Sequence, residues 1–206
     1  FEQILLPHEC FAPFRPVGLP DIRLIVFNLV PVMAMLRIPT AASEGKANLH
    51  LGGIGVGIDI AKGVTTHAAQ YHHMIDELPH GGSPTGHAIP HWDEILLVCS
   101  RIQQITNIGY LAVDITVDEQ MGPAVLEVNA RAGLNVQVAN LAPLRARLER
   151  VKGLQISSPE KGVRMGQDLF GEKVAVQKEE SDERLVLGLK ESITITGAGS
   201  SFEEPC

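Results

Sequence analysis

The sequence predicts an α+β domain with a mainly antiparallel sheet flanked by helices. Short runs of β-branched and apolar residues, broken by proline and glycine, come first along the chain. Helical periodicity appears only after residue 90, and a hairpin-like pair of runs follows that helix. This order of strands, helix, hairpin and helix favours an antiparallel sheet in an α+β arrangement.

The first part of the chain predicts an antiparallel meander. Alternation of glycine with Ile and Val over residues 53–60 indicates a strand that another backbone or a ligand approaches closely. Small polar residues and Gly45 predict a loop over 39–48, and glycine and proline around Ser83 predict a surface loop over 75–90. The expected strands are 1–6, 21–27, 32–37 (after a turn at 28–31), 53–60 and a short one after Gly63.

The second part predicts helices around a hairpin. A stripe of Ile95, Cys99 and Ile102 indicates a helix over 91–106, which the Asn107–Gly109 segment ends. The remaining expected elements are strands at 110–117 and 124–129, joined by a turn at 118–123, and helices at 141–150 and 161–170.

Bulk composition excludes several classes of protein. The chain carries 17 basic and 24 acidic residues, a formal charge of −7, which gives no basic surface for nucleic acid. No apolar run reaches the roughly 18 residues of a membrane helix. Cys10, Cys99 and Cys206 are too few and too scattered for a disulfide framework or a zinc site, so we expect reduced thiols and a cytoplasmic protein.

The strongest chemical signal is a trio of oxygen-bearing side chains in the expected hairpin. Glu127 and Asn129 face the same way because strand side chains alternate, and the hairpin can bring Asp114 onto that face. Two carboxylates and an amide oxygen suit a magnesium ion shared with nucleotide phosphates. A surface strand with ordinary outward polar residues is the open alternative.

Arginines interrupt two otherwise apolar strands. Arg23 and Arg37 would lie on adjacent strands, where forked guanidinium groups could flank a phosphoryl group moving onto a carboxylate. A pair of edge arginines satisfied by Asp21 or Glu44 is the alternative. The glycines at 52–57 do not lead from a strand into a helix, so they form neither a Rossmann nor a P-loop motif.

These motifs together resemble the ATP-grasp superfamily, in its α-L-glutamate-ligase-like, RimK-related branch, which is close to the sugar-transfer-associated ATP-grasp group. The most specific pieces are the Asp-Ile-Arg strand at Asp21, the segment 33–53, and Val-Asp114 with Leu-Glu127-Val-Asn129. The resemblance covers about residues 1–170. It implies the C-terminal lobe of that fold, with the preceding smaller lobe missing.

The resemblance also implies roles for individual residues. Metal ligands would be Asp114, Glu127 and Asn129, and Arg23 and Arg37 would contact the transferred phosphate or the carboxylate substrate. Nucleotide-binding residues would be Glu2, Gln3, Ile4, Leu5, Lys46, Asn48 and His50; the first four belong to a hinge strand along adenine, and the last three to a loop over the nucleotide. Arg131 would lie within reach of substrate.

The implied activity is ATP-dependent ligation of a carboxylate to an amine through an acylphosphate. The cofactors would be ATP and Mg²⁺, with Mn²⁺ as a substitute, and the substrates glutamate or another amino acid with a peptide or small acceptor. Two alternatives stay open: an ATP-grasp enzyme of cell-surface saccharide modification, and a non-catalytic module that kept the fold for protein–protein contact. A homo-oligomer is an open alternative to a monomer.

The expected organisation has three parts. Residues 1–171 would be the ATP-grasp domain, truncated at its N-terminus, and residues 172–184 a charged linker. Residues 185–206 would begin a truncated β element with a faint likeness to a retropepsin-like domain. Because relatives carry a phosphate-binding lysine in the missing lobe, we expect the 206-residue piece alone to bind ATP weakly and to have no turnover.

Overall fold

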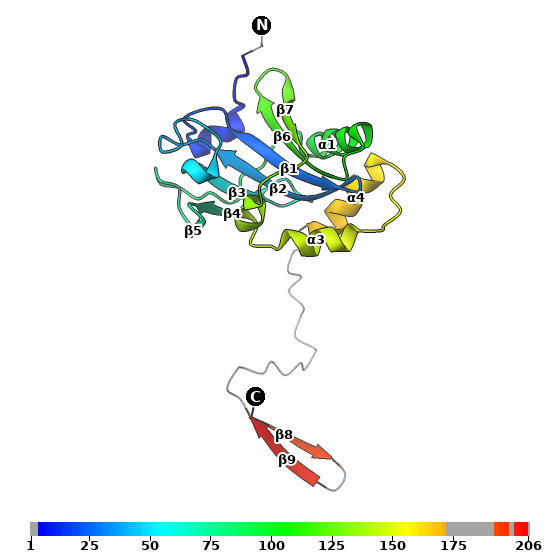
Figure 1. The fold of residues 1–206 in the computed structure, drawn as a ribbon. Helices are drawn as coiled ribbons and strands as arrows, with labels where there is room; N and C mark the ends of the chain where they lie inside the picture. Colours follow the sequence, from blue (N-terminus) through cyan, green and yellow to red (C-terminus); the bar gives the residue numbers. More distant parts are fainter. Residues whose placement is uncertain (1–3, 172–191, 198–199, 206) are drawn as a thin grey trace. The chain divides into compact units, whose positions relative to one another are not determined.

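The computed structural model describes residues 4–171, 192–197 and 200–205, which fall into two units, Phe1–Glu172 and Lys173–Cys206. In the first unit the strands form one sheet in the order β5-β4-β3-β2-β1-β6-β7, and every neighbouring pair is antiparallel. Helices lie against this sheet (Figure 1). The predicted α+β class with an antiparallel sheet is therefore confirmed.

The elements of the first unit follow the predicted order, with some additions. Its strands are β1 (Asp21–Phe27), β2 (Val30–Ile38), β3 (Ile54–Ile58), β4 (Thr65–Gln70), β5 (His73–Ile75), β6 (Tyr110–Asp118) and β7 (Gly122–Asn129). Its helices are η1 (Glu9–Phe14), η2 (Leu49–Leu51), α1 (Trp92–Thr106), α2 (Asn135–Ala139), α3 (Leu144–Val151) and α4 (Pro159–Phe170). In the second unit, β8 (Ser192–Gly197) pairs with β9 (Ser200–Pro205).

Several predicted boundaries differ from the structure. The β1–β2 turn is only Asn28 and Leu29, both with positive φ, so β2 begins at Val30 rather than after Pro31. The helix expected from Leu141 begins at Leu144, because Leu141 is left-handed and Pro143 occupies the N-cap. Residues Ile4–Leu6 form no strand.

The start of the described chain is nevertheless tied to the sheet. The Leu6 amide donates to Asp118 Oδ2 (2.7 Å), the Glu119 amide donates to the Leu6 carbonyl (2.9 Å), and Pro7 forms an isolated bridge with Asp118. Asp118 also accepts the Gln120 and Met121 amides (2.9 Å each). These backbone hydrogen bonds hold the pKa of Asp118 below its usual value. The segment thus caps the β6–β7 end of the sheet.

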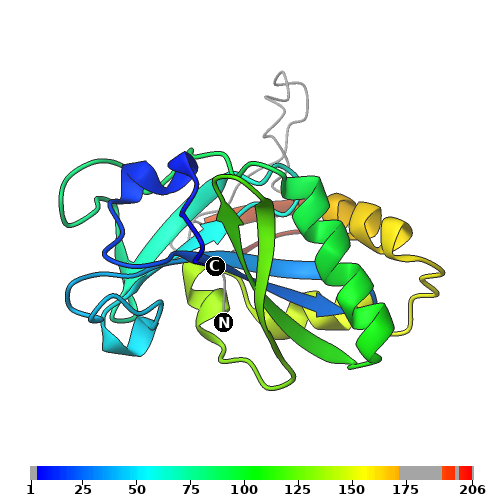
Figure 2. The same ribbon diagram turned by 90° about the horizontal axis from the view of Figure 1, so that it is seen from above.

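One face of the sheet is covered by α1 and α4, which pack against each other and against β1 and β2 (Figures 1 and 2). The helical stripe predicted for α1 supplies this contact, since Ile95, Leu96 and Cys99 are fully buried. On the opposite face α2 lies on β3, where a Cβ on Gly57 would stand 2.4 Å from the Ala139 carbonyl oxygen. The glycine-rich strand is therefore approached closely by another backbone, as its sequence predicts.

Candidate functional site

The strand register brings the predicted charged residues onto one face of the sheet. Asp21 pairs with Arg37, and Arg23 lies opposite Asp114, so β2, β1 and β6 carry these side chains in two adjacent rows of the same face. Arg37 in turn pairs with Gly55 of β3. This is the face on which α2 lies, because Gly55 and Gly57 of β3 contact Ala139 there.

Ion pairs link these four charged residues. Arg23 binds Asp114 with two parallel hydrogen bonds, from Nε to Oδ1 (2.8 Å) and from Nη2 to Oδ2 (2.7 Å). Arg37 binds Asp21 in the same way, from Nε to Oδ1 (2.5 Å) and from Nη2 to Oδ2 (2.8 Å). The Arg37 Nη2 also lies 2.7 Å from Asp114 Oδ2, which closes the chain of charges Asp21–Arg37–Asp114–Arg23.

The network is almost out of water. The side chains of Arg23 and Arg37 are 14% and 12% exposed, and those of Asp21 and Asp114 are 8% and 3% exposed. Burial raises the pKa of Asp21 to about 6, against the opposing effect of Arg37. Burial alone would lower the pKa of Arg23, but its bonds and charge interaction with Asp114, with further help from Asp21 and Glu127, raise it overall. Arg23 therefore stays charged.

Arg23 and Arg37 both line a cavity of about 460 Å³. Its other walls are residues 46–50 of the loop after β2, Met35 of β2, and Gly133 and Asn135 after β7. Asn48 shapes the loop wall because its side chain accepts the His50 amide (2.9 Å) and caps η2. Across the cavity, Asn135 Nδ2 lies 3.4 Å from His50 Nε2. We call this space the arginine pocket.

The predicted metal ligands gather beside the arginine pocket. Glu127 lies directly opposite Asp114 on β7, and Asn129 is two residues further along the same face. Glu127 is exposed, and its charge is close enough to Arg23 to raise the arginine's pKa. Within the described part of the chain, no three or more His, Cys, Asp or Glu side chains cluster so as to hold a metal. The protein ligands of a metal ion here would therefore be two carboxylates and an amide.

These residues fit a hard divalent cation. Asp114 Oδ1 accepts one hydrogen bond, from Arg23 Nε, so the oxygen has a lone pair for a further partner. Glu127 makes no ion pair to any described side chain, and the register directs it toward Asp114. Carboxylate and amide oxygens are what magnesium prefers, with remaining positions filled by water or phosphate oxygens. Asp114 would share its charge between such a cation and the arginines.

The predicted nucleotide-binding residues fall into two groups in the structure, one at the arginine pocket and one away from it. Lys46, Asn48 and His50 line the arginine pocket together with Arg23 and Arg37. Ile4 and Leu5 do not line it; Ile4 is 84% exposed, and the segment runs beside the β6–β7 turn. Glu2 and Gln3 lie outside the described residues. Arg131 is exposed and follows β7.

Sequence reasoning missed several residues of the site. Gly133 and Asn135 line the pocket although their segment has no strand or long helix pattern, and α2 is only five residues long. Tyr110, on the face of β6 that carries Asp114, has a buried hydroxyl without a hydrogen-bond partner among the described residues. Burial raises the pKa of Tyr110, and the Arg23 charge opposes that rise. The only hint of Tyr110, Gly133 and Asn135 in the sequence is that they stand close to the Asp114–Asn129 hairpin.

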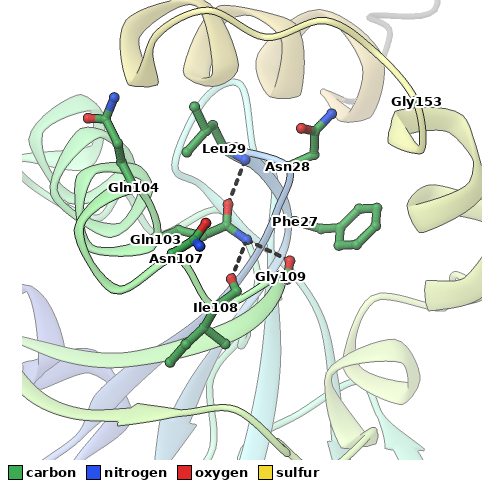
Figure 3. Close-up of a pocket in the computed structure, with 9 residues that line it drawn as sticks. All are labelled: Phe27, Asn28, Leu29, Gln103, Gln104, Asn107, Ile108, Gly109 and Gly153. Atoms are coloured by element: carbon green, nitrogen blue, oxygen red, sulfur yellow. Dashed lines mark hydrogen bonds between the residues drawn. The ribbon is translucent and has the colours of Figure 1, made fainter.

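A second cavity of about 460 Å³ lies at the other end of β1, between the β1–β2 turn, the end of α1 and Gly153 (Figure 3). At its wall the Gln103 side chain accepts the Leu29 amide (2.5 Å) and donates to the carbonyls of Ile108 (3.1 Å) and Gly109 (2.7 Å). No lining residue is charged. The Gln103 side chain is thus occupied by hydrogen bonds to the backbone. The arginine pocket, in contrast, has the positive charges that suit an anionic ligand.

The chain matches a known protein family. A family model described as sugar-transfer associated ATP-grasp matches residues 1–153, which include β1 to β7, the charged network and every residue of the arginine pocket. No curated protein matches the chain. Among the described residues no helix has the length and apolar character needed to cross a membrane.

Proposed function

Because the chain belongs to the sugar-transfer-associated ATP-grasp family, we propose that it carries the phosphate- and cation-binding wall of an ATP-dependent carboxylate–amine ligase. The observation that carries the proposal is the arginine pocket. Two mostly buried arginines, Arg23 and Arg37, stand beside an exposed carboxylate, Glu127, that lies opposite Asp114. Fixed positive charge next to a cation site is what phosphoryl transfer requires.

The proposed reaction has two steps. A carboxylate oxygen of the substrate attacks the γ-phosphorus of ATP, a new P–O bond forms, and the bond to the β,γ-bridging oxygen breaks to release ADP. The acceptor amine then attacks the acyl carbon, a C–N bond forms, and the acyl C–O bond breaks to release phosphate while the amine loses a proton. Little covalent work is asked of the protein, which positions the groups and neutralises their charge.

Each side chain has a definite task in this scheme. Arg23 and Arg37 would hold oxygens of the moving phosphoryl group or of the attacking carboxylate, because their charge is fixed and their geometry is forked. Lys46, Asn48 and His50 would close over the nucleotide from the loop side. Asp114, Glu127 and Asn129 would hold Mg²⁺, with Mn²⁺ as a substitute, which when bound neutralises charge on the phosphates.

The family description favours a second candidate for the acceptor. Sugar-transfer association suggests an ATP-grasp enzyme that acts in saccharide modification, so that the acid or the amine is borne by a sugar derivative rather than by a peptide. Both candidates use the same pocket and the same acylphosphate step. They differ only in which substrate bears the acid or the amine.

The test is ADP release by the full-length protein with ATP, magnesium and separate pools of amino acids, peptides and amino- or carboxy-sugars. We expect release that depends on one pool and that Asp114→Asn and Glu127→Gln both abolish. The pool that supports release distinguishes the two acceptors. Release that both variants leave unchanged would refute the assignment of the metal-binding residues, and nucleotide binding that ignores both variants would favour a non-catalytic module.

A further inference from the structure

The two arginines of the pocket are held from behind by different aspartates. Arg37 donates from Nε and Nη2 to the two oxygens of Asp21, and Arg23 uses the same edge for Asp114. Asp21 is 6% exposed and does not line the pocket, so it is out of reach of a ligand there. Its carboxylate contacts the pocket only through Arg37.

The geometry of guanidinium decides what remains for a ligand. Arginine has five N–H donors in a rigid plane, and a carboxylate that takes the Nε–Nη2 edge leaves the Nη1 group free. Arg37 Nη1 makes no hydrogen bond within the described residues, and Arg37 lines the pocket. The Asp21 contact therefore fixes which end of Arg37 is available.

Asp21 also balances charge. Without it, two guanidinium groups would share the single carboxylate of Asp114, from which Arg37 Nη2 is already only 2.7 Å away. Arg37 would then turn toward Asp114, because a buried cation that has lost its partner is strongly unfavourable. That movement would withdraw Arg37 from the ligand and crowd the oxygens of Asp114.

We propose that Asp21 is a positioning residue, which holds the Nε–Nη2 edge of Arg37 so that Nη1 faces the arginine pocket for an anionic oxygen of phosphate or carboxylate. The proposal rests on the proposed function, since it assigns Asp21 to the same anion site. Asp21 acts through Arg37 and does not touch the ligand itself. It follows that the effect of losing Asp21 must depend on the presence of Arg37.

A double-mutant cycle tests this dependence. Magnesium–ATP affinity of the full-length protein would be measured by calorimetry for the wild type, Asp21→Asn, Arg37→Gln and the double variant. We expect Asp21→Asn to weaken binding about tenfold, the value of a lost hydrogen bond to a charged group, and to have no further effect once Arg37 is replaced. Additive losses, or an unchanged affinity in Asp21→Asn, would overturn the proposal.

Two further measurements separate positioning from stability. Asp59→Asn removes another buried carboxylate, 5% exposed and outside the arginine pocket, and we expect it to leave affinity unchanged. The Arg37 Nε–H resonance of the ligand-free protein should exchange slowly in the wild type and quickly in Asp21→Asn, while that of Arg23 stays slow. An Arg37 resonance that Asp21→Asn does not move would also overturn the proposal.

Different results would refute the proposed function and the proposed role of Asp21. A wild-type protein that binds no magnesium–ATP would refute the proposed function, and the Arg37 resonance would then still decide the role of Asp21. A wild type that binds magnesium–ATP, with Asp21→Asn binding equally well, would refute the role of Asp21 and leave the proposed function standing.

Discussion

Asp114 interacts with two arginines through one buried carboxylate, an arrangement that is costly unless every charge is matched. Arg23 takes both of its oxygens and Arg37 approaches Oδ2, while Asp21 neutralises the second guanidinium. Burying such charges seldom adds stability over apolar packing, since desolvation offsets their attraction. Their presence is consistent with the anion site proposed above, and two consequences of their burial can be measured at single residues.

The first concerns Asp21 and pH. Because its folded pKa is raised from 3.8 to about 6, the folded protein binds this proton more tightly than the unfolded chain does. The contribution of Asp21 to the free energy of unfolding is thus greatest below pH 4 and is lost as pH rises to about 6. Its size is at most roughly 3 kcal/mol, the equivalent of the rise in pKa.

Urea denaturation at several pH values between 4 and 7 measures this contribution. The wild type should lose stability relative to Asp21→Asn as pH rises through that interval, because the asparagine carries no titrating proton. Parallel curves for the two proteins would show that Asp21 has an ordinary pKa in the folded state.

The second concerns the Tyr110 hydroxyl, which is buried and unpaired among the described residues. Tyr110→Phe removes only that oxygen, so it should leave thermal stability unchanged or raise it by up to about 1 kcal/mol. Tyr71→Phe, at a half-exposed ring on the β4–β5 turn, is the matched control and should be neutral. A loss of more than about 1 kcal/mol in Tyr110→Phe would mean that the hydroxyl has a structural hydrogen bond.

At the scale of elements, the β1–β2 hairpin is the part that holds both arginines, and its tip is tightly fixed. The left-handed Leu29 donates its amide to Gln103 Oε1 (2.5 Å), and its carbonyl accepts the Ser100 hydroxyl (2.6 Å), both from α1. The neighbouring α4 packs so closely on the tip that a Cβ on Gly162 would lie 2.0 Å from the Leu29 carbonyl oxygen. These contacts fix the strands that carry Arg23 and Arg37.

Gly162→Ala tests the close contact of α4 with this tip. Alanine normally stabilises a helix interior relative to glycine, but here the added methyl meets backbone that cannot move aside. We expect a loss of about 1–3 kcal/mol in the free energy of unfolding. Gly109→Ala, at a glycine with open space around its Cα, should be tolerated. Equal stability of both variants would show that α4 can shift away from the hairpin.

The sequence predicted the elements that have strong periodicity. The apolar stripe of α1, the β6–β7 hairpin and β1 lie within a few residues of their expected bounds. The three-residue β5 and five-residue α2 were missed because neither is long enough to show a period. β2 begins earlier than predicted because Asn28 and Leu29, both with positive φ, form the whole turn. Local composition does not reveal these dihedral angles.

The site was predictable in its residue types and less so in its contacts. Arg23, Arg37, Lys46, Asn48 and His50 do meet at one pocket, because register and loop position follow from the strand order. The bond from Arg23 to Asp114 joins residues 91 positions apart, and only the β1–β6 pairing brings them together. The roles of these residues in binding ATP and magnesium stay predictions.

In the first unit as a whole, the two faces of the sheet have different surroundings. One face packs against α1 and α4, while the other, which α2 partly covers, carries the arginines, the candidate cation ligands and the pocket. Glu127 lies on β7, the edge strand, where Val125, Leu126 and Val128 are also exposed. Glu127, one of the candidate cation ligands, is therefore exposed beside two arginines that are mostly buried.

The most direct measurement is the magnesium dependence of ATP affinity in the full-length protein, compared between the wild type, Glu127→Gln and Glu119→Gln. Glu119→Gln makes the same change of charge in the same hairpin, at an exposed position in the β6–β7 turn. We expect magnesium to strengthen ATP binding to the wild type and to Glu119→Gln, and we expect Glu127→Gln to reduce this effect of magnesium about tenfold or more. Equal magnesium dependence in all three proteins would contradict this expectation.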